Sequence, residues 1–266
     1  MALEREERDA ATLEAGYDRT HRAYELSGIV GAIMMAGWLL ARIVRSEPIS
    51  LGWMALAAFI GILAADFTSG FVHWMFDTWG SVDTPIVGRL AIRTFRHHHV
   101  DEKAITRHDF VETNGHNFAL SLLPGTVGVL WVQPATATAF DVFFGTALLG
   151  LAVVNTWTSQ IHKWAHMDER PRIVRFLQRT RIILHPKHHS VHHQSPHRRN
   201  YCITVGWLNG PLRAIRFFET LERIITAVTG AIPRADDLGA AAAAELAAQP
   251  EAPHGAKPDP SMPIGA

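Results

Sequence analysis

The sequence predicts an all-α integral membrane bundle of about four transmembrane helices, with a histidine-rich cytosolic cap that holds a di-metal site. Two observations lead to this prediction. Four uncharged apolar runs are long enough to cross a lipid bilayer. Thirteen of the 16 histidines fall in two short windows, 97–116 and 162–197. Neutral imidazole is the commonest metal ligand in proteins, and a protein core does not need histidines back to back.

The overall composition narrows the class of protein. A chain of 266 residues forms one domain or a small pair of domains. Its formal net charge is zero with histidine neutral, so nothing favours binding to nucleic acid. The single cysteine, Cys202, excludes an internal disulfide and any metal site built from several cysteines. Residues Met1–Glu25 are polar, so we expect no cleavable signal peptide.

The four apolar runs are predicted to be membrane-spanning helices, because a spanning helix needs roughly 20 mostly apolar residues. Pro124 and Gly125 are expected to kink the third run. The alternative is four buried helices of a soluble bundle, but helices of this length that are apolar all round are typical of lipid. The uncharged runs are Leu26–Ala41, Ile49–Ala65, Asn117–Phe140 and Val142–Gln160.

Four crossings would place both histidine windows on one side of the membrane. With the N-terminus inside, the second helix delivers His73 to the inner face, and the chain after His162 stays inside. The positive-inside rule agrees, because the inner segments are rich in Lys and Arg and the outer turn at Pro134–Thr138 has neither. Arg42 and Arg45, in the first outer loop, weakly oppose it.

Three further segments complete the predicted organisation. Ile173–Leu184 is expected to lie along the membrane surface as an amphipathic helix. Leu212–Val228 has helical periodicity and is expected to pack under the membrane domain. From Leu238 the chain is Ala-rich and then Pro-rich, which predicts disorder. The domains are therefore a polar segment 1–25, a membrane domain 26–237 and a tail 238–266.

Histidine spacing predicts metal ligands at the inner ends of the helices. His162 and His166 lie one turn apart on one face of the fourth helix, which suits two ligands to one metal. Two solvated histidines at a helix end are the alternative. His73 adds an imidazole from another helix.

A denser histidine run follows at 188–193. It contains His-x-x-His-His at 189–193, preceded directly by His188, and adjacent histidines on a helix point in different directions. One short segment can therefore serve two metals, with solvated side chains as the alternative. His98 and His99 resemble the same arrangement. The run supplies His188, His189, His192 and His193.

A carboxylate lies within the second apolar run. Asp66 comes two helical turns before His73, and a charge at that depth is expensive and usually functional. It can orient His73, serve as a ligand, or make an ordinary interhelical hydrogen bond. Asp77, one turn after His73, is a similar candidate.

The ligand set favours iron. The chain has no His-Glu-x-x-His motif of zinc hydrolases, and its predicted helices contain no Glu-x-x-His motif of soluble di-iron bundles. Eight or more histidines exceed what one metal coordinates, which indicates two metals. Redox iron is the natural use of histidine-rich sites with open positions.

Several stretches resemble the plasmanylethanolamine desaturase family, which includes the plant plastid desaturases that put a trans double bond into phosphatidylglycerol. The resemblance spans roughly Ser27 to Asp237. It rests on Ala65–Gly70 with His73-Trp74, Asp77–Gly80, His98–Asp101, Ala104–Phe110, Glu112–Gly115, Gln160–Trp164 with His166, His188-His189, His192-His193, Ser195–His197, Tyr201–Thr204, Gly206–Asn209 and Pro233–Asp237.

This resemblance implies a membrane lipid desaturase that uses two iron ions, O2 and two external electrons. The substrate is expected to be the sn-1 alkyl ether chain of plasmanylethanolamine, and the product the vinyl ether of a plasmalogen. Because no Gly-x-Gly-x-x-Gly occurs for a flavin or nicotinamide, a separate ferredoxin- or cytochrome-type protein is expected to supply electrons. Both termini and the metal site are expected on the cytosolic side.

The resemblance also implies the site residues. The expected catalytic residues are Asp66, His73, His98, His99, His192 and His193. The expected metal ligands are His73, His98, His99, His108, His162, His166, His188, His189, His192, His193 and His197. The sequence departs from the family pattern at His97, His116 and His185, and we do not expect these three to be primary ligands.

Three alternative functions remain open from the sequence. A desaturase acting on an ester-linked chain of a phospholipid such as phosphatidylglycerol would need no ether lipid. A histidine-rich hydroxylase would leave oxygen in its product. A non-enzymatic membrane metal-binding protein, such as a transporter, would need polar ligands midway through the helices, whereas these histidines collect at one end.

Overall fold

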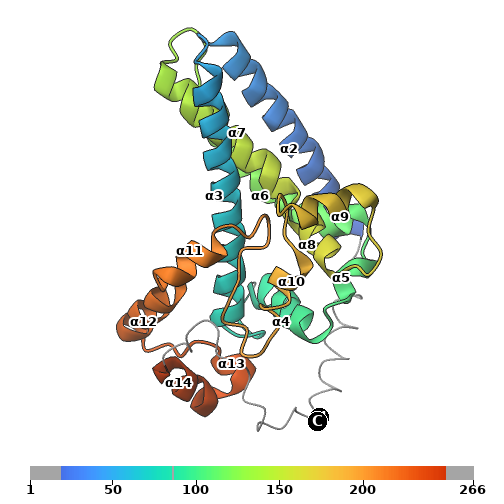
Figure 1. Cartoon of the computed structure of the whole chain (residues 1–266), viewed down its shortest axis with the longest axis vertical. Coiled ribbons are helices and arrows are strands. Elements are labelled where there is room, and N and C mark those ends of the chain that lie inside the picture. Colours follow the sequence, from blue (N-terminus) through green and yellow to red (C-terminus); the bar gives the residue numbers. More distant parts are fainter. Residues whose placement is uncertain (1–18, 86, 250–266) are drawn as a thin grey trace.

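A computed structural model describes residues 19–85 and 87–249, and within these ranges the chain is helical with no strand, which confirms the predicted all-α class. Long helices run alongside one another in one part of the molecule, and short helices gather at one end (Figure 1). The long helices are α2 (Arg19–Arg45), α3 (Leu51–Thr78), α6 (Phe110–Trp131) and α7 (Ala139–Thr156), and α8 (Thr158–His166) continues α7.

Three helical segments in the described part of the chain are long and apolar enough to cross a membrane: Arg19–Arg45, Leu51–Thr78 and Ala139–His166. The run predicted as the third of four spans corresponds to α6, which is not among them. Its first turns are polar, with Glu112, Asn114 and Asn117. The number of four crossings therefore stays a prediction.

The turn between α6 and α7 lies where the sequence predicted a hairpin turn, at Pro134–Thr138. The helix α6 ends at Trp131 and α7 begins at Ala139, so Phe140, the last residue of the third uncharged run, belongs to α7. A capping box starts α7, in which the Thr138 side chain accepts from Asp141 N and the Asp141 carboxylate accepts from Thr138 N. This cap supplies a local signal for a helix start within the apolar run.

The long helices pack closely through small residues and expose apolar side chains outward. A Cβ at Gly61 of α3 would overlap the backbone of α7, so only glycine allows this approach. Large apolar side chains such as Met34, Leu123 and Leu130 are about two-thirds exposed, at 68%, 68% and 70%. Such outward-facing apolar surface is what a lipid environment solvates.

The short elements form the cap that was predicted at one end. They are a π-helical turn η1 (Gly88–Ile92), α4 (Arg93–Val100), α5 (Ala104–Arg107), α9 (Arg172–Arg179), α10 (Pro186–His189), α11 (Asn209–Ala214), α12 (Phe217–Thr229), α13 (Ala235–Leu238) and α14 (Ala240–Ala248).

Two predicted helices are shorter than expected, and one segment is more ordered. The amphipathic segment 173–184 is helical only as α9. The segment 212–228 is divided into α11 and α12 because Arg216 adopts a left-handed backbone, with φ of 55°. The tail expected to be disordered contains α14, where consecutive alanines favour a helix. Residues 250–266 of that tail lie outside the described residues.

A buried ionic network ties the C-terminal helices to α3. Glu222 of α12 accepts from Trp74 Nε1 at 3.0 Å and from Arg234 Nη2 at 2.5 Å. Arg234 also donates to the Tyr201 hydroxyl at 2.9 Å. Both charges are almost fully buried, and each is paired, as buried charges must be.

Candidate metal centre

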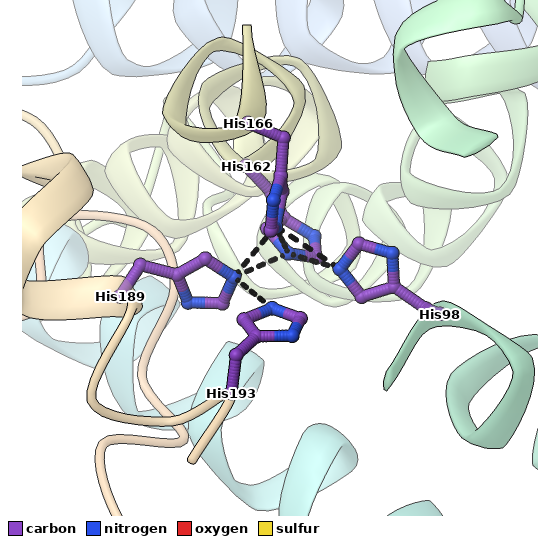
Figure 2. Close-up of side chains that lie close together, drawn as sticks. All are labelled: His98, His162, His166, His189 and His193. Atoms are coloured by element: carbon purple, nitrogen blue, oxygen red, sulfur yellow. Dashed lines mark hydrogen bonds between the residues drawn. The ribbon is translucent and has the colours of Figure 1, made fainter. Parts of the chain in front are cut away.

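Five histidines of the cap converge on one point (Figure 2). Their Nε2 atoms form a chain of contacts, with neighbouring pairs 2.8–3.1 Å apart. They come from α4, α8, α10 and the turn after α10, so segments distant in sequence meet here. The five, called cluster 1 below, are His98, His162, His166, His189 and His193.

A second group of possible ligands adjoins the first. One carboxylate oxygen of Asp77 faces three imidazole nitrogens. The distances from Asp77 Oδ2 are 3.3 Å to His73 Nε2, 3.6 Å to His99 Nε2 and 3.4 Å to His192 Nε2. These four residues, called cluster 2 below, are His73, Asp77, His99 and His192.

Adjacent histidines in the sequence supply the two different clusters. His98 belongs to cluster 1 and His99 to cluster 2, and their ring centroids are 6.5 Å apart. His193 and His192 divide in the same way, with centroids 5.5 Å apart. The clusters are therefore neighbours, held at a short separation by two covalently adjacent pairs.

Helical spacing explains the remaining members. His73 and Asp77 lie one turn apart on α3, and His162 and His166 lie one turn apart on α8, so each pair shares a helix face. The local fold of α10 is set by His185, whose Nδ1 caps the helix by accepting from Lys187 N.

Polar groups outside the clusters fix the orientation of several rings. His73 Nδ1 donates to the Tyr201 carbonyl at 3.2 Å, and His192 Nδ1 donates to the Arg199 carbonyl at 2.8 Å. An N–H on Nδ1 leaves a lone pair on Nε2, which is the atom that faces the cluster.

Glu102 is a functional candidate that the sequence reasoning missed. Its carboxylate lies 3.4 Å from His193 Nδ1 and 3.7 Å from His166 Nδ1, on the far side of both rings from cluster 1. A carboxylate behind a ligating histidine is a common supporting group. Its position just after Asp101 in a polar stretch gave no pattern that separates it from solvated acids.

Burial favours the neutral form of three cap histidines, His99, His189 and His193. Desolvation, and then the neighbouring imidazoles, hold the pKa of His99 and of His189 well below the ordinary histidine value. The same causes lower the pKa of His193 to about 2. Neutral imidazole is the form that binds a metal ion.

Four predicted site residues lie outside both clusters. His108 lies 3.5 Å from the Glu112 carboxylate, and His188 Nε2 accepts from Asn209 Nδ2 at 3.0 Å. His197 stacks on His99, with ring centroids 4.1 Å apart. Asp66 does not meet His73, because its oxygens accept from the backbone N–H groups of Val205, Gly206 and Leu208.

Three histidines depart from the family pattern, and the two whose side chains the structure describes also lie outside clusters 1 and 2. His185 caps α10. His116 contacts Glu25. His97 lies in α4, and its side chain is outside the described residues.

Comparisons with known proteins point in one direction. Residues 62–236 match a family model described as a lipid desaturase domain. The chain is 47% identical over 241 residues to plasmanylethanolamine desaturase of Myxococcus xanthus, covering 90% of this chain and 84% of that protein. It is 46% identical over 203 residues to plasmanylethanolamine desaturase 1 of Mus musculus, covering 75% and 73%.

A more distant relative is a plant protein. The chain is 33% identical over 182 residues to chloroplastic fatty acid desaturase 4 of Arabidopsis thaliana, covering 68% of this chain and 54% of that protein. No solved structure matches the chain.

Proposed function

Because the chain belongs to the lipid desaturase family, we propose that it desaturates the sn-1 alkyl ether chain of plasmanylethanolamine and yields the vinyl ether of a plasmalogen. The chain is an oxidoreductase acting on a membrane lipid. The observation that carries the choice of substrate is the 47% identity, over 84% of its length, to a relative named for that reaction.

The cap residues fit a pair of iron ions. In cluster 1, the Nε2 atoms of His162, His166 and His189 are all within 3.1 Å of one another. A neutral ring nitrogen is either a donor or an acceptor, so two of any three must be alike and repel. A cation at their centre removes this conflict, because every Nε2 then presents a lone pair to it.

Cluster 2 fits a cation for a different reason. His73 Nε2 and both Asp77 carboxylate oxygens are buried, with no hydrogen-bond partner among the described residues. A buried charge without compensation is costly, and a bound cation supplies the compensation. We infer that cluster 1 holds one iron through five imidazoles and that cluster 2 holds the other through three imidazoles and Asp77.

Bound reduced iron with O2 supplies the oxidising power that no side chain has, which unactivated C–H bonds require. This chain's own groups set the geometry. Tyr201 and Arg199 carbonyls hold the rings of His73 and His192, and Asp66 holds the loop 205–208 that follows Tyr201. The ligand side chains are mostly buried, which keeps bulk water from the centre.

The reaction removes two hydrogens, one from each of the first two carbons of the alkyl chain, and a carbon–carbon double bond forms. O2 is reduced to two waters with those two hydrogens, two protons and two electrons. The two electrons come from a ferredoxin- or cytochrome-type protein that docks on the cap. The cap and both chain ends lie on the cytosolic side, as the distribution of Lys and Arg favours.

Lipid mass spectrometry tests this function in a host that lacks vinyl ethers and is fed an alkyl ether precursor. We expect an acid-labile ether lipid two mass units lighter than the precursor. His192→Ala should abolish it, because it removes a cluster 2 imidazole. His185→Asn is the matched control, because it removes an imidazole outside both clusters and asparagine is also a good helix N-cap.

A second candidate function is desaturation of an ester-linked acyl chain, which the match to a plant fatty acid desaturase favours. In the same experiment, unchanged ether lipids with new double bonds in ester-linked chains would select it. A product heavier by one oxygen would instead identify a hydroxylase. Unchanged lipids from folded, iron-loaded protein would reject all three.

A further inference from the structure

A third group of metal-ligating side chains lies away from the two clusters. Glu25, near the start of α2, has a carboxylate oxygen 3.8 Å from His21 Nε2 and 3.5 Å from His116 Nδ1. His21 is one turn before Glu25 on α2, and His116 belongs to α6. All three possible ligand atoms lie within 4.8 Å of one another.

The carboxylate is the buried member and the imidazoles face outward. The Glu25 side chain is 0% exposed, whereas His21 is 31% and His116 is 57% exposed. Gly115 makes this burial possible, because a Cβ there would overlap the Glu25 side chain. The chain thus places a buried carboxylate beneath two imidazoles that are partly exposed at the protein surface.

The distances fit a shared cation better than direct ion pairs. A charge-assisted hydrogen bond between histidine and a carboxylate would be about 2.7–2.9 Å long. Ligand atoms that share a transition-metal ion lie about 3.0–3.4 Å apart, since each is about 2.1 Å from the ion. The observed 3.5 and 3.8 Å are longer than such a hydrogen bond and nearer to the spacing of shared ligands, and all three ligand atoms lie within 4.8 Å of one another.

We propose that His21, Glu25 and His116 bind a third divalent transition-metal ion, of the Zn2+ or Fe2+ class, separate from the di-metal centre. Two imidazoles and one carboxylate suit such ions, and positions left open can be filled by water. The ion joins α2 to α6, next to the ion pair that Arg22 makes with Asp109, the N-cap of α6.

The site has a structural connection to the cap. Asn114, adjacent to Gly115, donates to Gln160 of α8 at 3.2 Å, and His162 follows two residues later. A cation that fixes α6 against α2 therefore also fixes the helix surface on which α8 rests. Its role is to hold these helices in register rather than to take part in the chemistry.

Metal counting on the purified full chain tests the site independently of lipid desaturation. Protein loaded with iron and then dialysed against Zn2+ is analysed for total iron plus zinc. We expect about three ions per chain, matching the three groups of ligands. His116→Asn should lose one ion, whereas His116→Asp, which has the shape of that asparagine but supplies an anionic ligand, should retain it.

Two further variants sharpen the result. Glu25→Gln should also lose one ion, and His185→Asn should lose none, because His185 lies outside all three groups. Added Zn2+ should raise the thermal midpoint of the parent chain by a few degrees and leave that of His116→Asn unchanged.

The parent chain and His116→Asn are first shown to be folded by size-exclusion chromatography. Equal metal content in the two proteins would then overturn the proposal. Loss of iron from clusters 1 and 2 is scored separately with His192→Ala, so a failure of the proposed function is distinguished from a failure of the third site.

Discussion

Two aspartates of α3 have different environments although the sequence offers both beside His73. Asp66 accepts three backbone N–H bonds from the loop 205–208, so it organises the chain next to Tyr201. Asp77 faces three imidazoles instead. Depth in the apolar run favoured Asp66 as a site residue, but depth alone does not say which groups a carboxylate meets.

Asp77→Asn tests this difference. The change keeps the shape of the side chain and removes the negative charge of cluster 2, so we expect metal affinity there to fall at least about 10-fold. Metal content after dialysis measures it. Asp66→Asn provides the contrast, with a lower thermal midpoint but full metal content in the folded fraction. Full retention of metal by Asp77→Asn would contradict the assignment.

Cys202 is predicted to be unreactive. Burial, and then the nearby Asp66 carboxylate, raise the pKa of this thiol well above its usual value. A raised pKa means less thiolate at pH 8, and the thiolate is the nucleophile. We expect iodoacetamide at pH 8 to modify the native chain far more slowly than the denatured chain. Mass spectrometry of the intact protein gives both rates, and similar rates would refute the prediction.

The histidine pattern predicted that one short segment can serve two metals, and the pairs 98–99 and 192–193 do supply both clusters. It did not predict that His188 and His108 lie outside them. Which way a ring points depends on neighbours such as Asn209, which bonds His188, and such contacts are set by the folded chain. Glu102 was missed for the same reason.

At the scale of elements, α12 and α13 hold Tyr201 against the metal centre. Arg234 bridges Glu222 and the Tyr201 hydroxyl, while the Tyr201 carbonyl accepts from His73. The C-terminal helices therefore support His73, a member of cluster 2 on α3, through one arginine. Nothing in the local sequence of either helix indicates this connection, because it joins residues 12 and 33 positions apart.

Arg234→Ala should be strongly destabilising. It leaves the buried Glu222 carboxylate without its cation, which costs about 3–5 kcal/mol. The double variant Arg234→Met, Glu222→Gln should recover part of that loss, since it removes both charges. Thermal unfolding in detergent compares them, and equal midpoints for the parent and Arg234→Ala would refute the prediction.

The long helices were predictable where one signal dominates. Uniform apolar composition located α2, α3 and α7. The start of α6 was less predictable, because its polar first turns merge with the preceding histidine window. Its end falls just before the predicted turn at Pro134–Thr138. An alanine-rich segment can likewise be disordered, because it has few side chains to form a core, or helical, because alanine has the highest helix propensity. In α14 the helix propensity prevails.

At the scale of the whole molecule, the two clusters bring together side chains of α3, α4, α8 and α10, which are distant in the sequence. Removing the ions should therefore loosen the entire cap. For an ion present at about 1,000 times its Kd, the lost binding energy is about 4 kcal/mol for each site, or about 10 °C in thermal midpoint per ion. Chelation followed by calorimetry measures the shift, and reloading with Fe2+ should reverse it.

Chelation should also release both ions of the centre together, because each of the pairs 98–99 and 192–193 contributes one histidine to cluster 1 and the other to cluster 2. Stepwise loss, with one ion leaving while the other stays fully bound, would contradict this coupling. The third site predicted at Glu25 shares no residue with them, so its ion should leave independently.

The division of neighbouring histidines between clusters has a consequence for biosynthesis. Cluster 1 needs residues from 98 to 193, and cluster 2 needs residues from 73 to 192. Neither cluster can assemble until the chain as far as His193 has left the ribosome. By then the long helices have already left the exit tunnel. Under the proposed function, iron delivery is therefore a late step of biosynthesis, and a chain truncated before His192 would have neither cluster complete.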